Sequence, residues 1–165
     1  MGTGYHGGFG ATKGSAYKKS SSSKHNQSVT ISLKREDIID ALMGVTLAST
    51  VVAELIRDKK IGINILGDKL FDATLRKDVD PKKTNAYQDK NQIYIRRSAL
   101  KGYTNFVHEG THAYDYIKGV IKPASFEGEL RAYMNEHEYQ IKKGEHVEYE
   151  GEGEIRVHIK LEYGY

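Results

Sequence analysis

Two histidines four residues apart, with a glutamate beside the first, are the residues of this chain that most clearly predict chemistry. They lie in the stretch His108-Glu109-Gly110-Thr111-His112. On a helix, residues four apart share one face, so both imidazoles can bind one metal ion while Glu109 projects toward a water on that metal. This pattern is typical of helix-borne zinc sites that hydrolyse amide bonds. We therefore predict a hydrolase with one Zn²⁺ per chain as its cofactor.

A catalytic zinc takes three protein ligands and leaves its fourth position to water, so a third ligand must come from elsewhere in the chain. The chain has no cysteine, and the remaining donors are histidine and carboxylate. A second helix, predicted near residues 126–143, carries Glu127, Glu129 and Glu136. We favour Glu129, because the small Ala132 follows on the same face and lets two helices approach closely. All three glutamates remain candidates at this point.

The chemistry that such a site implies is metal-assisted hydrolysis. Zinc lowers the pKa of its water and polarises the scissile carbonyl, while Glu109 takes the water's proton and passes it to the leaving amine. A donor to the developing oxyanion is also expected, and the candidates are Tyr133, His137 and Tyr139. Asp115, three residues after His112, is a candidate to hold a ligand histidine in place, with a bond to a neighbouring loop as the alternative.

The motif His108-Glu109-x-x-His112, followed by Glu129-x-x-Ala132, resembles the glutamate zincins, which are thermolysin-like metallopeptidases. The resemblance covers residues 90–143. The third ligand would lie seventeen residues after the second histidine, a compressed spacing compared with thermolysin.

Ala113 and Asp115 make the motif more similar to small metallopeptidase domains of bacterial toxins and effectors. The glycine-rich residues 4–10 resemble the junction to an upstream delivery domain. Two features depart from the zincin pattern. Gly110 replaces a bulky apolar residue, which suggests a close neighbour, and Tyr133 follows Ala132 where larger relatives carry an aspartate that supports a histidine.

The resemblance implies a metalloendopeptidase rather than an exopeptidase, acting on a protein or peptide. Its substrate would lie extended along an edge strand formed by Ile93, Tyr94 and Ile95. It also implies an immunity or inhibitor protein as a partner. The domain would be delivered as part of a larger secreted effector and would act in a cytosol.

The elements that must position these residues are predicted from apolar spacing. Apolar residues between 38 and 56 recur at helical spacing, with Gly44 as an interruption and Ser32 as an N-cap. Residues 61–66 and 92–96 alternate as strands do, and a stripe along residues 100–117 predicts the helix of the metal motif. The polar residues 68–89 predict a strand or turn followed by a loop. Residues 154–161 alternate after a Gly-Glu-Gly turn, which predicts a closing hairpin.

These elements predict an α+β fold, and the resemblance implies a compact, minimal zincin-like domain over residues 29–165. A small, mostly antiparallel sheet would pack on the active-site helix and the glutamate helix, with a core helix near the N-terminus. Residues 1–28, rich in glycine, serine and lysine, read as a flexible lead-in. At 38% hydrophobic and 28% charged residues, the composition is that of an ordinary soluble domain.

Charge and hydropathy exclude several classes of protein. The most apolar run has only thirteen uncharged residues between Asp40 and Glu54, too few to span a membrane, and the N-terminus lacks the apolar segment of a signal peptide. Residues 1–35 carry six basic and no acidic side chains, but nothing beyond charge favours nucleic acid as a partner. Two alternatives to a peptidase remain: a non-catalytic zincin-like binding module, and a zinc hydrolase of a non-peptide amide.

Overall fold

The computed structural model describes residues 33–100 and 102–165, and within them the chain forms an α+β fold. The elements follow in the order α1 (Arg35–Leu42), α2 (Leu47–Arg57), β1 (Gly62–Leu66), α3 (Asp68–Thr74), β2 (Ala86–Asp89), β3 (Gln92–Arg96), a 3₁₀ turn η1 (Arg97–Ala99), α4 (Thr104–Lys118), α5 (Phe126–Lys143) and α6 (Glu152–Tyr163). The predicted lead-in of residues 1–28, the domain start at Val29 and the N-cap Ser32 lie outside the described residues.

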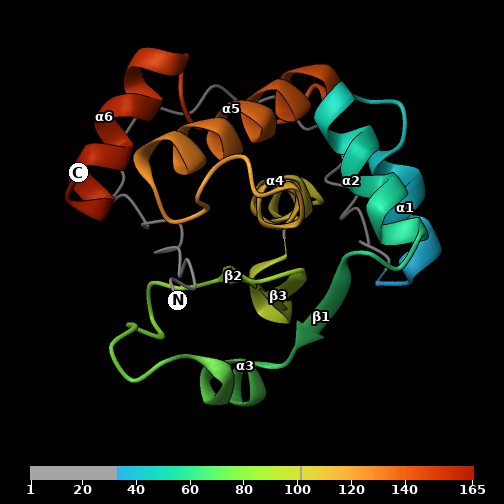
Figure 1. Ribbon diagram of the computed structural model, residues 1–165, viewed down its shortest axis with the longest axis horizontal. Helices are drawn as coiled ribbons and strands as arrows, with labels where there is room; N and C mark the ends of the chain where they lie inside the picture. The colour runs from blue at the N-terminus through green and yellow to red at the C-terminus, as the bar shows by residue number, and fades with distance from the viewer. Residues whose placement is uncertain (1–32, 101) are drawn as a thin grey trace, which may run out of the picture.

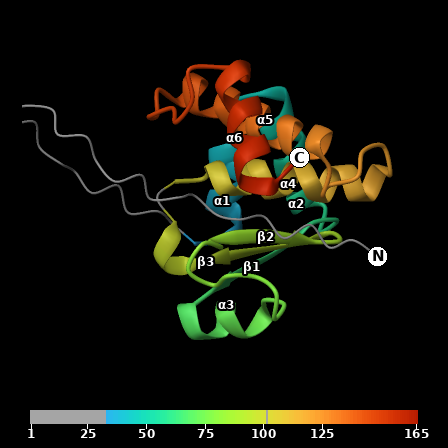
Figure 2. The same ribbon diagram turned by 90° about the vertical axis from the view of Figure 1, so that its left-hand side faces the viewer.

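The sheet has the strand order β1-β3-β2 and separates two layers of helices. β1 runs parallel to β3, whereas β2 pairs antiparallel with β3, so the sheet is mixed rather than mostly antiparallel. Helix α3 lies on one side of the sheet and the remaining helices lie on the other (Figure 2). The alternation of β3 explains this: Ile93 and Ile95 are fully buried in the main core, while Tyr94 stacks on Tyr87 on the side of α3.

The N-terminal helical region divides at Gly44, as predicted. Gly44 has φ of 75°, a left-handed conformation that glycine adopts without strain, and α1 ends just before it. Helix α2 then begins with a capping box in which Thr46 and Ser49 each bond the other's backbone N–H. Fully buried Val52 and Ile56 join α2 to the main core.

The prediction for residues 154–161 was wrong, because they form helix α6 instead of a hairpin. Ile155 and Ile159 are one helical turn apart and fully buried, whereas Val157 and Leu161 are exposed. The four apolar residues fit a strand and a helix equally well by spacing, and packing against α5 selects the helix. Tyr133 of α5 joins Ile155 and Ile159 in a second, smaller core cluster.

Residues 68–89 also differ from the prediction at their start. Asp68–Thr74 form the short helix α3, which is held against the sheet by Phe71 packing edge-on to Tyr87 at 5.6 Å. A strand, β2, comes only at the end of the segment. No helix in the described part of the chain is both long and apolar enough to cross a membrane.

Candidate metal centre

Helix α4 brings the two histidines of the motif together on one face. The Nε2 atoms of His108 and His112 are 3.3 Å apart, and both side chains are buried. On another face of the same helix, Gly110 packs against α2: a Cβ there would overlap Cγ1 of Val52 and lie 2.8 Å from its Cγ2. This explains why the motif carries glycine at the position where a bulky residue was expected.

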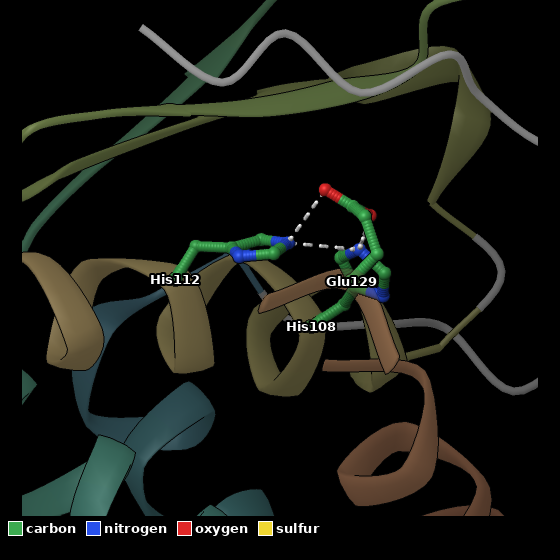
Figure 3. A group of neighbouring side chains, drawn as sticks. All are labelled: His108, His112 and Glu129. Atoms are coloured by element: carbon green, nitrogen blue, oxygen red, sulfur yellow. Dashed lines mark hydrogen bonds and ion pairs between the residues drawn. The ribbon is translucent and has the colours of Figure 1, made fainter. Parts of the chain in front are cut away.

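Helix α5 contributes Glu129 to the same point. Its carboxylate oxygens lie 3.8 Å from Nε2 of His108 and 3.7 Å from Nε2 of His112 (Figure 3). The helix starts one turn earlier at Ser125, whose hydroxyl accepts a hydrogen bond from the Gly128 N–H. Gly128 allows this tight start, because a Cβ would come within 2.5 Å of the carbonyl oxygens of Lys122 and Pro123.

The three side chains have the donor types and spacing of an open zinc site. Two imidazole nitrogens and one carboxylate oxygen lie within 4.8 Å of one another, and all three residues are buried. Tetrahedral zinc with bonds of about 2.0–2.1 Å would hold its ligand atoms about 3.3–3.4 Å apart. The histidine pair matches that value. The two carboxylate oxygens of Glu129 each lie a few tenths of an ångström farther than that from one imidazole, Oε2 from His108 and Oε1 from His112. These residues therefore fit a zinc ion with small side-chain adjustments.

Glu136, a candidate third ligand by sequence, occupies a different position. Its Oε2 lies 3.0 Å from Nδ1 of His108, the ring nitrogen that points away from His112. A carboxylate there accepts the Nδ1–H and leaves the Nε2 lone pair for a metal. Burial lowers the pKa of His108, but the Glu136 hydrogen bond and the charges of Glu109, Glu136 and Glu129 outweigh it and raise this pKa to about 9. The remaining candidate, Glu127, is exposed at the start of α5.

Glu109, the predicted general base, is buried beside the three candidate ligands, with 3% of its surface exposed. Its charge contributes to raising the pKa of His108, which places it within electrostatic reach of that ring. A buried carboxylate next to a candidate metal cluster is the kind of group that could exchange a proton with a metal-bound water.

Asp115 is tied to α5. Its Oδ1 accepts a hydrogen bond from the Arg131 guanidinium, which also lies over the Tyr114 ring at 5.2 Å. Burial raises the pKa of Asp115 to about 6, although the charge and hydrogen bond of Arg131 oppose the shift. Its contact in the structure is thus one between helices α4 and α5, and the support of a ligand histidine comes from Glu136 instead.

The three candidate oxyanion donors lie at different places along α5. The ring of Tyr133 meets the ring of His108 edge-on at 4.6 Å, so Tyr133 borders the cluster. Tyr139 belongs to the main core, where its hydroxyl donates to the Ala41 carbonyl at 3.0 Å. His137 follows Glu136 directly and is half-buried.

Sequence reasoning assigned no role to two residues that bond Tyr133, because residues 154–161 predict a hairpin and not a helix that continues to Tyr163. Tyr163 and His158 of α6 both lie 3.2 Å from the Tyr133 hydroxyl. A helical signal was present: Lys160 precedes Gly164, a basic last turn followed by a C-cap glycine that has φ of 71° in the structure.

The predicted substrate strand requires a correction. Ile93, Tyr94 and Ile95 lie on β3, which is the central strand and pairs with β1 on one side and β2 on the other. Its backbone groups are used in the sheet, so β3 cannot accept an added strand. The edges of this sheet are β1 and β2.

Comparison of the chain with protein-family models, with curated protein sequences and with solved structures finds no match.

Proposed function

We propose that this protein is a zinc-dependent metallopeptidase, a metalloendopeptidase of the kind found as toxin or effector domains. One observation carries the proposal: the side chains of His108, His112 and Glu129 come from two helices to a single buried point, and Glu109 lies beside them. A structural zinc site would fill all four positions with protein ligands, whereas three nitrogen and oxygen ligands are typical of a catalytic one.

Each residue of the proposed site has one role. His108, His112 and Glu129 hold the metal, and Glu136 fixes the ring of His108 through the 3.0 Å contact at Nδ1. Bound zinc supplies Lewis acidity, which lowers the pKa of water and polarises a carbonyl. Glu109 accepts a proton from the attacking water and delivers it to the nitrogen of the leaving amine. The water oxygen bonds to the carbonyl carbon and the C–N bond breaks, which balances the hydrolysis.

The partners proposed are those that this chemistry requires or that the sequence resemblance implies: a protein or peptide substrate, an immunity or inhibitor protein, and an upstream delivery domain. The site of action proposed is the cytosol into which such a domain is delivered.

The test is proteolysis by the zinc-loaded protein with Glu109→Gln as its inactive counterpart. The protein is incubated with a proteome-derived peptide library, and new termini are identified by mass spectrometry. We expect cleavage by the wild type and a loss on the order of 10²–10⁴-fold in Glu109→Gln, which removes the base but no candidate ligand. Glu138→Gln, at an exposed glutamate of α5, is the matched control and retains wild-type activity.

Two outcomes would contradict the proposal. Zinc-loaded wild type that cleaves no peptide would favour a non-catalytic binding module or a hydrolase of a non-peptide amide. Cleavage that persists unchanged in Glu109→Gln would exclude Glu109 as the base.

A further inference from the structure

The end of helix α4 and its connection to α5 carry apolar side chains that the fold leaves exposed. Tyr116, Ile117 and Val120 have 49%, 37% and 65% of their surface exposed. None of the three belongs to either core cluster of the described chain. Helix α4 is seen end-on in Figure 1 and from the side in Figure 2, where its last turn and the connection to α5 project beyond the neighbouring helices. We call residues 116–122 the α4–α5 tip.

The charge of the α4–α5 tip is positive. Lys118 lies in the last turn of α4, Lys122 follows in the connection, and both are exposed. Neither lysine forms an ion pair with a carboxylate of residues 33–100 or 102–165. The sequence has no acidic residue between Asp115 and Glu127, and Asp115 is fully buried and bonded to Arg131. The tip therefore presents apolar groups and lysines together.

This combination fits the surface of a bilayer that contains anionic lipids. Exposed apolar side chains enter the boundary between the headgroups and the acyl chains, and nearby lysines are attracted to the negative surface. A single exposed apolar residue is ordinary, but three of them lie within five residues at a projecting end of the molecule. We propose that the α4–α5 tip docks this protein on an anionic membrane surface.

Docking at this point has a consequence for the candidate metal centre. Tyr116 follows His112 by four residues, which is about 6 Å along the axis of α4. A bilayer that receives the tip therefore lies close to the metal centre, and a substrate held at the membrane surface is within reach of it. The docking itself does not depend on the proposed peptidase activity.

Co-sedimentation with lipid vesicles tests the role of the lysines. The full chain is mixed with vesicles of phosphatidylcholine alone, or of phosphatidylcholine and phosphatidylserine in equal parts, and the partition coefficient is obtained from the bound fraction. We expect the wild type to bind the mixed vesicles far more strongly than phosphatidylcholine, and less strongly as salt is added. Lys118→Gln/Lys122→Gln should lower the partition coefficient on mixed vesicles about 30-fold, because each lysine near an anionic surface contributes about fivefold. The matched control Lys142→Gln/Lys143→Gln, in the exposed last turn of α5, should change it much less.

A second pair of variants tests the apolar contact. Tyr116→Ser/Val120→Ser leaves the charge unchanged and should weaken binding to mixed vesicles on the order of tenfold, because two apolar side chains no longer leave water. Leu47→Ser/Leu161→Ser is the matched control, since these leucines of α2 and α6 are 82% and 80% exposed, and it should bind as the wild type does. Circular dichroism verifies that each variant is folded.

Tryptophan fluorescence locates the contact with the bilayer. The chain has no tryptophan, so a single introduced indole reports only on its own surroundings. We expect the emission of Val120→Trp to shift to shorter wavelength when mixed vesicles are added, because the indole enters an apolar layer. Leu47→Trp, on α2, should show no shift.

Three results would overturn this inference. Equal binding of the wild type and both tip variants to mixed vesicles would assign the binding to another basic region, such as residues 1–35. A wild type that binds neither kind of vesicle would favour a protein as the partner of the tip. A shift in Leu47→Trp without one in Val120→Trp would place a different face on the membrane. None of these measurements requires zinc or turnover, so they leave the peptidase proposal to its own test.

Discussion

At the scale of single residues, the candidate site gathers three buried carboxylates around the imidazole of His108. Glu109, Glu129 and Glu136 all lie close enough to His108 to raise its pKa, and each has at most 3% of its surface exposed. Buried carboxylates without compensating charge are costly, so a bound cation would relieve their repulsion as well as supply chemistry. The sequence predicted His108, Glu109, His112 and the choice of Glu129, but not the distinct place of Glu136.

The sequence could not separate the positions of Glu129 and Glu136 for a geometric reason. Glu129 and Glu136 are seven residues apart, almost two full turns, so they lie on the same face of α5 and a sequence gives both the same orientation. The two glutamates differ only in their position along α5 relative to α4. Glu129 lies beside both Nε2 atoms, whereas Glu136 lies beside the Nδ1 of His108.

The buried carboxyl of Asp115 predicts how the stability of the protein depends on pH. Because burial raises its folded-state pKa to about 6, above the value of an unfolded aspartate, this group contributes stability at low pH that is lost as the pH rises through about 6. We therefore expect the free energy of unfolding of the metal-free wild type, relative to Asp115→Asn, to decrease between pH 4.5 and 7.5. Urea denaturation at four pH values measures this. A relative stability of the wild type that increases with pH would mean that pairing with Arg131 outweighs burial.

At the scale of elements, helices with long periodic segments and defined ends were predictable. Helix α5 (Phe126–Lys143) lies between the N-cap Ser125 and the C-cap Gly144, which has φ of 66°, and its bounds match the predicted range 126–143. Elements that are defined by contacts between distant parts of the sequence were not predictable. The apolar residues of α6 alternate in a way that also suits a strand, and α3 is seven residues long with Phe71 as its one buried residue. The central place of β3 follows from pairing with a parallel strand whose partner residues lie 30 positions earlier in the chain, which no local pattern encodes.

The contact between α2 and α4 yields a prediction about Gly110. Alanine there gains up to about 1 kcal/mol of helix propensity, but its Cβ overlaps Val52, and overpacking costs about 1–3 kcal/mol. We expect chemical denaturation to show a lower free energy of unfolding for Gly110→Ala than for the wild type. The double variant Gly110→Ala/Val52→Ala should lose less of this free energy than the sum of the losses in the two single variants. Gly153→Ala on α6, where a Cβ meets nothing within 4 Å, is the control and should lose no stability. Equal stability of Gly110→Ala and wild type would show that the helices separate without cost.

At the scale of the whole molecule, the chain divides its packing between two apolar clusters, and the candidate site lies where they meet. Helix α4 belongs to the main core through Phe106, Val107 and Ala113, while α6 belongs to the smaller cluster. Helix α5 reaches both, through Tyr139 and Tyr133 respectively. A metal held between α4 and α5 would therefore join the two parts and stabilise the folded state by mass action.

The most direct test of the central claim is the zinc content of the purified protein, measured by elemental mass spectrometry. The wild type is compared with Glu129→Ala, Glu136→Ala and Glu127→Ala, each prepared without chelator or metal-affinity resin, with circular dichroism to verify folding. We predict about one zinc per chain in the wild type and in Glu127→Ala, and little or none in Glu129→Ala. Glu136→Ala should retain zinc with an affinity lower by about 10–100-fold, the usual effect of removing a group that orients a ligand. A folded wild type without zinc, even after zinc is added back, or full zinc content in Glu129→Ala, would contradict the account.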